Sequence, residues 1–91
     1  MNEEKRVRYE AISEKITQLA GGRENIVGLA HCATRLRLVL ADNEKADIKA
    51  MEEVDLVKGV FVAGDQVQII FGTGLVNDVC EVMGELNHMN T

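Results

Sequence analysis

Hydrophobic residues recur at two different spacings along this chain of 91 residues, and the two spacings predict different elements. Residues 7–20 carry isoleucine and leucine every three or four positions, which predicts an amphipathic helix, and Gly21-Gly22 follows as a stop. The same spacing predicts a closing helix over residues 75–86, after a turn at residues 72–74. The apolar stripe of this closing helix consists of Leu75, Val76, Val79, Cys80, Met83 and Leu86.

Alternating or short apolar runs predict strands between the two helices. Residues 35–40 alternate strictly, with leucines on one face and mostly arginines on the other. Residues 25–30 predict a weaker strand ahead of them, because they are only mildly apolar and are interrupted by Gly28. Residues 56–63 and 66–71 flank Gly64-Asp65, a two-residue connection that favours a β-hairpin. The alternation predicts that the leucines point into the core and the arginines point outward.

The element order is therefore α-β-β-α-β-β-α, if a short middle helix capped by Asp47 runs to Met51. Hairpin-linked strands pair antiparallel, and helices at both ends and in the middle can cover one face of such a sheet. We expect an α+β open-faced sandwich with a four-stranded antiparallel sheet. Residues 1–91 are expected to form a single domain, with its core at about 10–86 and a flexible tail at 87–91.

The net charge of −5 argues against a nucleic-acid module, because affinity for a phosphate backbone comes from gathered lysines and arginines. The early Lys5, Arg6 and Arg8 alternate with glutamates, which indicates a solvated helix face. No apolar run approaches the roughly 20 residues that a membrane helix needs. We therefore expect a soluble, intracellular chain that does not insert into a membrane itself.

Cys32 and Cys80 lie in different contexts, and an intracellular protein gives no reason to expect a disulfide between them. Cys80 lies on an apolar helix stripe and is expected in the core. Cys32 precedes Thr34, Arg35 and Arg37, which add a hydroxyl donor and two positive charges near the sulfur. Such surroundings favour a thiolate nucleophile.

Arg35 and Arg37 stand two apart on the predicted strand, so their side chains leave the same face and can converge on one anion. The alternative is that they only keep an exposed sheet face solvated. Gly72-Thr73-Gly74 before the last helix could also direct N–H groups at an anion, although a structural turn explains it equally. His31 and His88 with two separated cysteines supply too few ligands for a zinc site, so no metal and no cofactor are expected.

The motifs together are similar to those of a known family. Cys32-x-Thr34-Arg35-Leu36-Arg37, the entry at residues 21–26, the segment 57–60 and the segment 66–72 resemble the enzyme IIB domain of the bacterial sugar phosphotransferase system. The resemblance extends from about residue 10 to residue 86 and lies within the glucose and sucrose superfamily. The motif around the cysteine looks most like the sucrose, trehalose and β-glucoside branch.

The resemblance implies a phosphotransferase component with a phosphocysteine intermediate. Cys32 would accept a phosphoryl group from a phosphohistidine of a IIA protein and pass it to a sugar bound in a membrane-embedded IIC domain. Arg35, Arg37 and Thr34, with the backbone N–H of Ala33, would bind the phosphoryl oxygens. The chain would then work in the cytoplasm, at the inner face of the cell membrane.

Two other functions stay open at this point. A non-catalytic regulatory domain could sense a phosphate or carboxylate through Arg35 and Arg37, with Cys32 incidental. A redox-sensing thiol would use the same low pKa, but Cys80 is expected to be buried and gives no nearby resolving cysteine.

Overall fold

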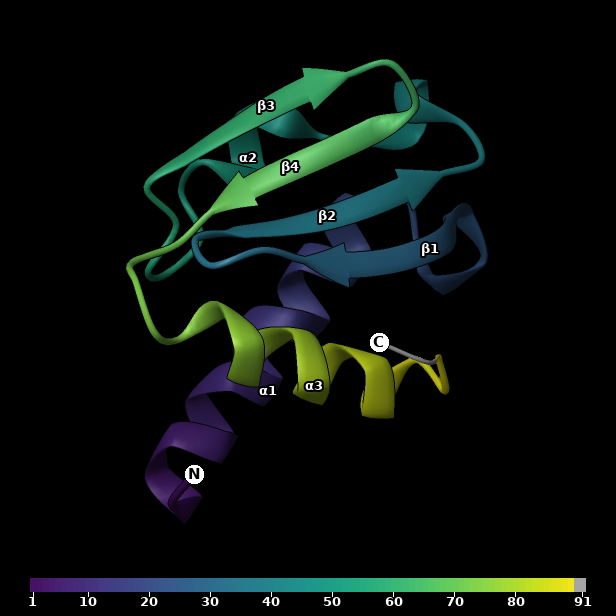
Figure 1. Ribbon diagram of the computed structural model, residues 1–91. Helices are drawn as coiled ribbons and strands as arrows, with labels where there is room; N and C mark the ends of the chain where they lie inside the picture. Colours follow the sequence, from purple (N-terminus) through teal and green to yellow (C-terminus); the bar gives the residue numbers. More distant parts are fainter. Residues whose placement is uncertain (90–91) are drawn as a thin grey trace.

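The computed structural model describes residues 1–89 and confirms the predicted element order. Figure 1 shows the chain from its N-terminal helix to its C-terminal helix. The helices are α1 (Glu3–Leu19), α2 (Ile48–Met51) and α3 (Val76–Leu86), with short 3₁₀ turns at Arg23–Asn25 and Asn43–Lys45. The strands are β1 (Ile26–His31), β2 (Arg35–Leu40), β3 (Gly59–Ala63) and β4 (Gln66–Ile70).

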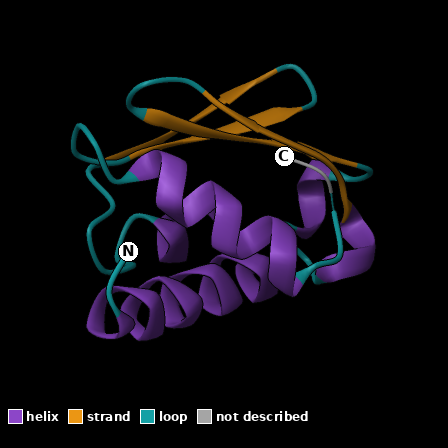
Figure 2. Ribbon diagram, turned by 60° about the horizontal axis from the view of Figure 1, so that its bottom comes forward, coloured by secondary structure: helices purple, strands orange, loops and turns teal. Residues whose placement is uncertain are grey.

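The strands form one antiparallel sheet in the order β1-β2-β4-β3, so β2 and β4 lie at its centre (Figure 1). One row of paired residues crosses the whole sheet: Ala30 on β1, Arg37 on β2, Gln68 on β4 and Phe61 on β3. The helices all cover the same side of the sheet, as Figure 2 shows from the edge. The predicted α+β open-faced sandwich is therefore confirmed.

The core lies between the covered face of the sheet and the helices, as the alternation predicts. Leu36, Leu38 and Leu40 of β2 point inward and are buried, while the residues between them stay partly exposed. Burial of these side chains is the main stabilising contribution, at about 25 cal/mol per Å² of apolar surface. Further buried hydrophobic residues are Tyr9, Ile12, Ile16, Met51, Val67, Ile69, Phe71, Val76, Val79, Cys80, Val82 and Met83.

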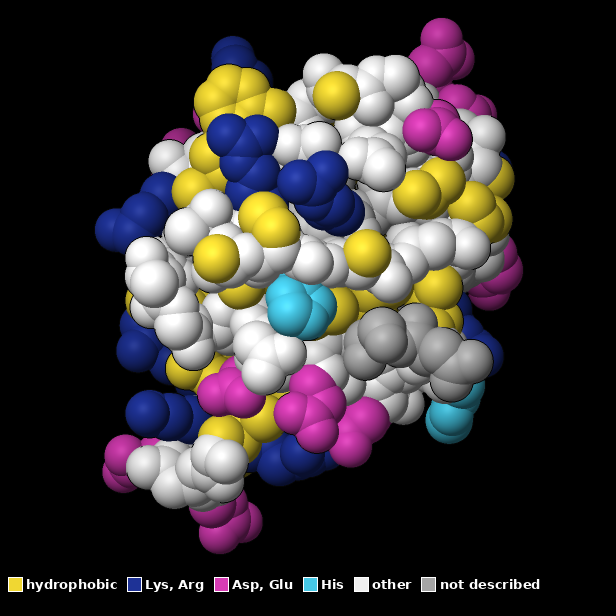
Figure 3. Space-filling model, viewed as in Figure 1, with side chains coloured by type: hydrophobic (Ala, Val, Ile, Leu, Met, Phe, Trp, Pro, Cys, Tyr) yellow, Lys and Arg dark blue, Asp and Glu magenta, His cyan; other side chains and the backbone are white. Residues whose placement is uncertain are grey.

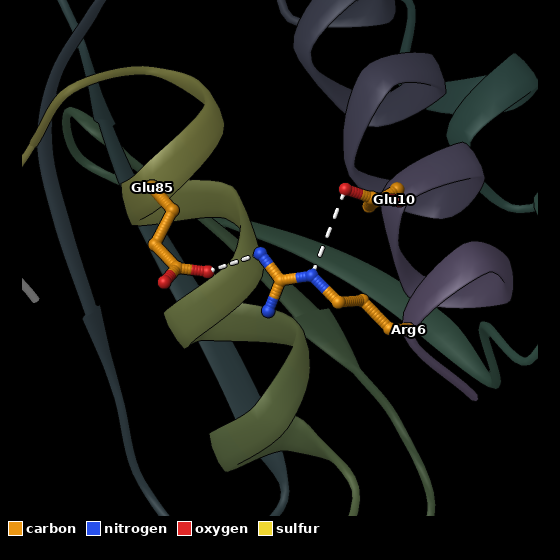
Figure 4. A network of polar contacts seen from close by, with 3 residues as sticks. All are labelled: Arg6, Glu10 and Glu85. Carbon is orange, nitrogen blue, oxygen red and sulfur yellow. Dashed lines mark hydrogen bonds and ion pairs between the residues drawn. The ribbon is translucent and has the colours of Figure 1, made fainter. Parts of the chain in front are cut away.

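Helix α1 begins four residues earlier than predicted, because Asn2 caps it by accepting a hydrogen bond from the Lys5 N–H. Its early charged face is exposed, as expected, but it also makes specific contacts. Arg6 donates to Glu85 of α3 at 2.7 Å and lies 3.8 Å from Glu10, as Figure 4 shows. Because these pairs are exposed and screened by solvent, they contribute little to the total stability.

The predicted start of the third strand is wrong for a local reason. Strand β3 begins at Gly59 and not at residue 56, because Leu56 adopts a left-handed conformation with φ of 69° that no strand accommodates. The predicted hairpin is confirmed: Ala63 pairs with Gln66 across two turn residues, and Gly64 takes a φ of 63° at the first of them. Glycine is favoured there because it has no Cβ to clash.

Asn25 is predicted to start the first strand, but it precedes β1, and its buried side chain instead makes hydrogen bonds to two backbone segments. Its Nδ2 donates to the carbonyls of Ala20 and Asp42 at 2.7 and 2.8 Å, and its Oδ1 accepts from the Asp42 N–H. The end of α1 is thereby fastened to the end of β2. At the other end of the chain, Asn87 was assigned to the loose tail, yet it is buried and donates to Thr17 of α1 at 3.0 Å. The rest of that predicted tail includes residues 90–91, outside the described part.

Candidate functional site

Cys32 lies in the short connection between β1 and β2, which are paired up to His31 and Leu36 at the edge of the loop. The Cys32 N–H donates to the Arg35 carbonyl at 2.9 Å and closes this loop. The Thr34 carbonyl accepts from the Phe71 N–H at 2.9 Å, which fastens the loop to the end of β4. Because both sides are held by backbone hydrogen bonds, the loop presents its thiol in a defined direction.

The surroundings of the sulfur lower the pKa of the Cys32 thiol from its ordinary value of 9.0 to about 7. The largest cause is the backbone N–H of Thr34, followed by the Arg37 side chain and the backbone N–H of Arg35, all of which donate toward the sulfur. Hydrogen bonds and a nearby positive charge favour the charged form of a thiol. The predicted thiolate nucleophile therefore has a physical basis at neutral pH.

Arg35 and Arg37 share the open face of the sheet, as predicted, but their guanidinium groups have different partners. The Arg37 side chain acts on the Cys32 sulfur. The Arg35 guanidinium instead donates to Gln68 at 2.8 Å and lies 5.5 Å from the centre of the Phe61 ring. Arg35 contributes to the thiol's low pKa through its backbone N–H alone, and sequence reasoning missed its two side-chain partners.

Basic and hydrophobic side chains lie together on this open face. Figure 3 shows Lys and Arg side chains beside hydrophobic ones over the strands, with Asp and Glu side chains toward the helices and the edge. Phe61 of β3 is 54% exposed, which is high for a large apolar residue. An acidic chain thus carries a local cationic surface on the face that also holds the Cys32 loop.

A hollow of about 440 Å³ adjoins Cys32 on its other side. Its walls come from the end of β1 and the loop on one side and from the turn before α3 and its first residues on the other: His31, Cys32, Ala33, Thr73, Gly74, Val76 and Asn77. The glycine turn singled out in the sequence therefore lies at the same site as the thiol. Ala33 is exposed at the loop, and the backbone N–H groups that act on the sulfur belong to Thr34 and Arg35 instead.

Other candidate groups lie apart from the sulfur. The ring Nδ1 of His31 lies 3.3 Å from the Cys32 carbonyl oxygen, so the polar contact of this ring is with the backbone. Cys80 is buried in α3, as expected, and burial raises the pKa of its thiol to about 11. Within residues 1–89, no three His, Cys, Asp or Glu side chains gather as a metal site would require, and no helix has the length and apolarity to cross a membrane.

Comparisons with known proteins place these features in a family. Residues 14–47 match the family model described as phosphotransferase system, EIIB. A crystal structure of one domain of the PTS system IIabc component from Clostridium difficile superposes with a TM-score of 0.84 at 41% sequence identity. That alignment covers 89% of this chain and 84% of the other.

Curated relatives agree with that structural match. The sucrose-specific EIIBC component of Bacillus subtilis is 51% identical over 77 residues, 85% of this chain and 17% of the relative. The corresponding component of Klebsiella pneumoniae is 56% identical over 71 residues, 78% of this chain and 16% of the relative. This chain therefore spans about one sixth of the length of these relatives. The chain belongs to the EIIB family of the sugar phosphotransferase system.

Proposed function

We propose that the chain is a phosphoryl carrier of a sugar phosphotransferase system, with Cys32 as the residue that carries the phosphoryl group. The observation that supports this most directly is the accessible thiol in a loop whose N–H groups and Arg37 lower its pKa to about 7. Phosphoryl transfer needs positioning and charge stabilisation more than covalent chemistry by the protein. A thiolate next to fixed donors supplies both.

In the first step, the Cys32 thiolate attacks the phosphorus of a phosphohistidine on a IIA protein. The P–S bond forms as the P–N bond breaks, and the imidazole leaves and takes up a proton from solvent. Arg37 and the N–H groups of Thr34 and Arg35 bind the phosphoryl oxygens, since the donors that favour a thiolate also favour a bound phosphate. The Thr34 hydroxyl adds a further donor, and the Arg35 guanidinium binds the phosphoryl group once Cys32 carries it.

In the second step, a sugar hydroxyl attacks the phosphorus while the sugar is bound in a IIC membrane domain. The P–O bond forms, the P–S bond breaks, and the thiolate leaves. A thiolate with a pKa near 7 is a good leaving group, because its charge is already stabilised by the loop. The proton of the sugar hydroxyl passes to a base of the acceptor domain.

The partners follow from the family. The relatives named above are EIIBC components, so a IIC domain is the proposed acceptor partner and a IIA protein the donor. The proposed location is the cytoplasmic face of the membrane that holds the IIC domain. Because those relatives are named sucrose-specific, sucrose is the first acceptor to test.

The deciding experiment supplies phosphoenolpyruvate, the general phosphotransferase proteins and a IIA protein of this class, and follows the intact mass of the chain. We expect the mass of one phosphoryl group in the wild type and in Cys80→Ser, and no added mass in Cys32→Ser. Cys80→Ser is the matched control because it removes the other thiol of the chain.

A wild-type chain that gains no phosphoryl group with any IIA protein of this class would overturn the proposal. Stabilisation of that same chain by inorganic phosphate or a carboxylate would then favour the anion-sensing domain. Addition of sucrose and membranes with the IIC domain is expected to remove the added mass from the phosphorylated chain, which tests the second step.

A further inference from the structure

Arg35 is held on the open face of the sheet by two neutral side chains from other strands. Its Nη1 donates to the Gln68 Oε1 at 2.8 Å, and its guanidinium lies 5.5 Å from the centre of the Phe61 ring. Gln68 in turn donates from Nε2 to Gln66 at 3.2 Å, which orients its oxygen toward Arg35. The guanidinium therefore has a defined resting position.

The sheet order creates this position. Arg35 is paired with Ile70 on β4, and Ile70 is paired with Gly59 on β3. Gly59 has no side chain to fill the outer end of this row, and a Cβ placed there would lie 3.8 Å from the Phe61 ring. Arg35 can therefore reach diagonally toward Gln68 and Phe61 in the next row, as diagonal neighbours on one sheet face do.

We propose that Gln68 and Phe61 are positioning residues that hold Arg35 in a resting position, from which it moves to the phosphoryl group only after Cys32 has received it. This inference rests on the proposed carrier function and adds two residues to its machinery. Neither residue touches the reacting atoms. Both act through Arg35.

The charge of its two alternative sets of partners decides where the Arg35 guanidinium lies. Arg35 is adjacent to the thiol, since the Cys32 N–H bonds to its carbonyl, so its side chain starts close to both positions. An amide oxygen and a ring face are neutral partners, whereas a phosphoryl group on Cys32 brings charged oxygens that bind a guanidinium more strongly. The resting position is consequently favoured before phosphorylation and disfavoured after it.

A carrier benefits from such a competing position. If Arg35 were free at all times, it would bind the phosphoryl group at full strength and slow its onward transfer. The interactions with Gln68 and Phe61 are lost when Arg35 moves, and this loss offsets part of the binding. The phosphoryl group stays transferable in both directions.

The test that needs no partner protein measures alkylation of Cys32 by iodoacetamide between pH 5 and 9, in Cys80→Ser throughout. Gln68→Leu removes the accepting oxygen and Phe61→Leu removes the ring while keeping apolar bulk. Each substitution is expected to free the Arg35 guanidinium to move toward the thiolate. The pH midpoint of Cys32 alkylation should then fall, and the alkylation rate at pH 6 should rise by about threefold, which corresponds to the strength of one such contact.

The charged groups on the elements around the loop are known, which keeps this readout interpretable. Arg37 and Arg35 come from β2, and the Lys58 side chain lies beside Gly72, at the end of β4. His31 turns to the backbone, and the α3 residues that line the hollow are uncharged. In an Arg35→Gln background, neither substitution is expected to change the midpoint. Val62→Ala serves as the control. Val62 is exposed and follows Phe61 on β3, but its side chain leaves the opposite face of the sheet.

Unchanged midpoints in both single variants, or equal changes with and without Arg35, would overturn the proposal. A second measurement follows the phosphorylated fraction at equilibrium with a IIA protein. That fraction is expected to rise in Gln68→Leu and Phe61→Leu and to fall in Arg35→Gln. Absence of phosphorylation in the wild type would instead contradict the carrier function, while the alkylation result would still decide the resting position of Arg35.

Discussion

The two cysteines of this chain show how strongly local surroundings control one functional group. Cys32 lies in a loop, where N–H groups and Arg37 hold the pKa of its thiol at about 7. Cys80 lies in α3 with none of its surface exposed, and burial raises the pKa of its thiol to about 11. Two identical side chains therefore differ in thiolate content at neutral pH by orders of magnitude.

The difference teaches which physical effect matters at each place. At Cys32 the donors outweigh the modest desolvation, because the loop turns its N–H groups toward the sulfur. At Cys80 desolvation acts alone, since the groups around it are the apolar residues of the core. A reactive thiol here results from a loop rich in donors, and an inert one from a helix stripe.

The largest expected effect is the difference in alkylation rate between the two thiols. At pH 7 about half of Cys32 is thiolate, against on the order of one in 10,000 for Cys80, given pKa values of about 7 and about 11. We expect Cys80→Ser to react with one equivalent of iodoacetamide within minutes and Cys32→Ser to react only on unfolding. Intact-mass measurement checks both, and comparable native-state rates would refute the contrast.

For stability, the larger effect is expected at Cys80 and the smaller one at Cys32. Cys80→Ser places a hydroxyl at a fully buried apolar position, and we expect it to cost about 1–3 kcal/mol in the free energy of unfolding. Cys32→Ser changes a loop residue, so at pH 7 its free energy of unfolding should stay close to that of the wild type. Urea denaturation measures both values, and a larger loss in Cys32→Ser than in Cys80→Ser would be the contradictory result.

Arg37→Gln is expected to make Cys32 more like an ordinary thiol. The substitution removes both the side-chain donor and the positive charge that lower the thiol's pKa, while the N–H groups of Thr34 and Arg35 remain. The alkylation midpoint should therefore rise from about 7 without reaching 9.0, and Cys80 should be unaffected. Arg23→Gln, which removes a charge elsewhere, is the control.

The two thiols are also expected to change the free energy of unfolding with pH in opposite directions. Between about pH 7 and 9 the folded Cys32 has lost its proton and the unfolded one has not, so stability should rise with pH. Between about pH 9 and 11 the folded Cys80 keeps its proton while the unfolded one loses it, so stability should fall. Urea unfolding across this range in the two serine variants should remove the rise and the fall separately; persistence of both in each variant would contradict the assignment.

The fold was largely predictable because its signals are local. Helical and alternating spacing, the Gly64-Asp65 turn and the stop at Gly21-Gly22 depend on neighbours within a few residues. The errors have different causes: the positive φ of Leu56 is a local backbone conformation that shortens β3, whereas Asn25 bonds across to the distant Asp42 instead of extending a strand. Burial of Cys80 was also readable from the stripe on which it lies.

The same distinction between local signals and contacts of distant residues applies to the candidate site. The sequence by itself determined that Cys32 precedes two arginines on one strand face, because alternation along a strand is a property of the backbone. Only the tertiary structure decided that Arg37 serves the thiol while Arg35 rests on Gln68 and Phe61, and that the start of α3 closes the hollow. The contacts of Arg35 depend on the strand order β1-β2-β4-β3, which brings Phe61 and Gln68 beside it from more than 25 positions further along the chain. No local pattern encodes that order.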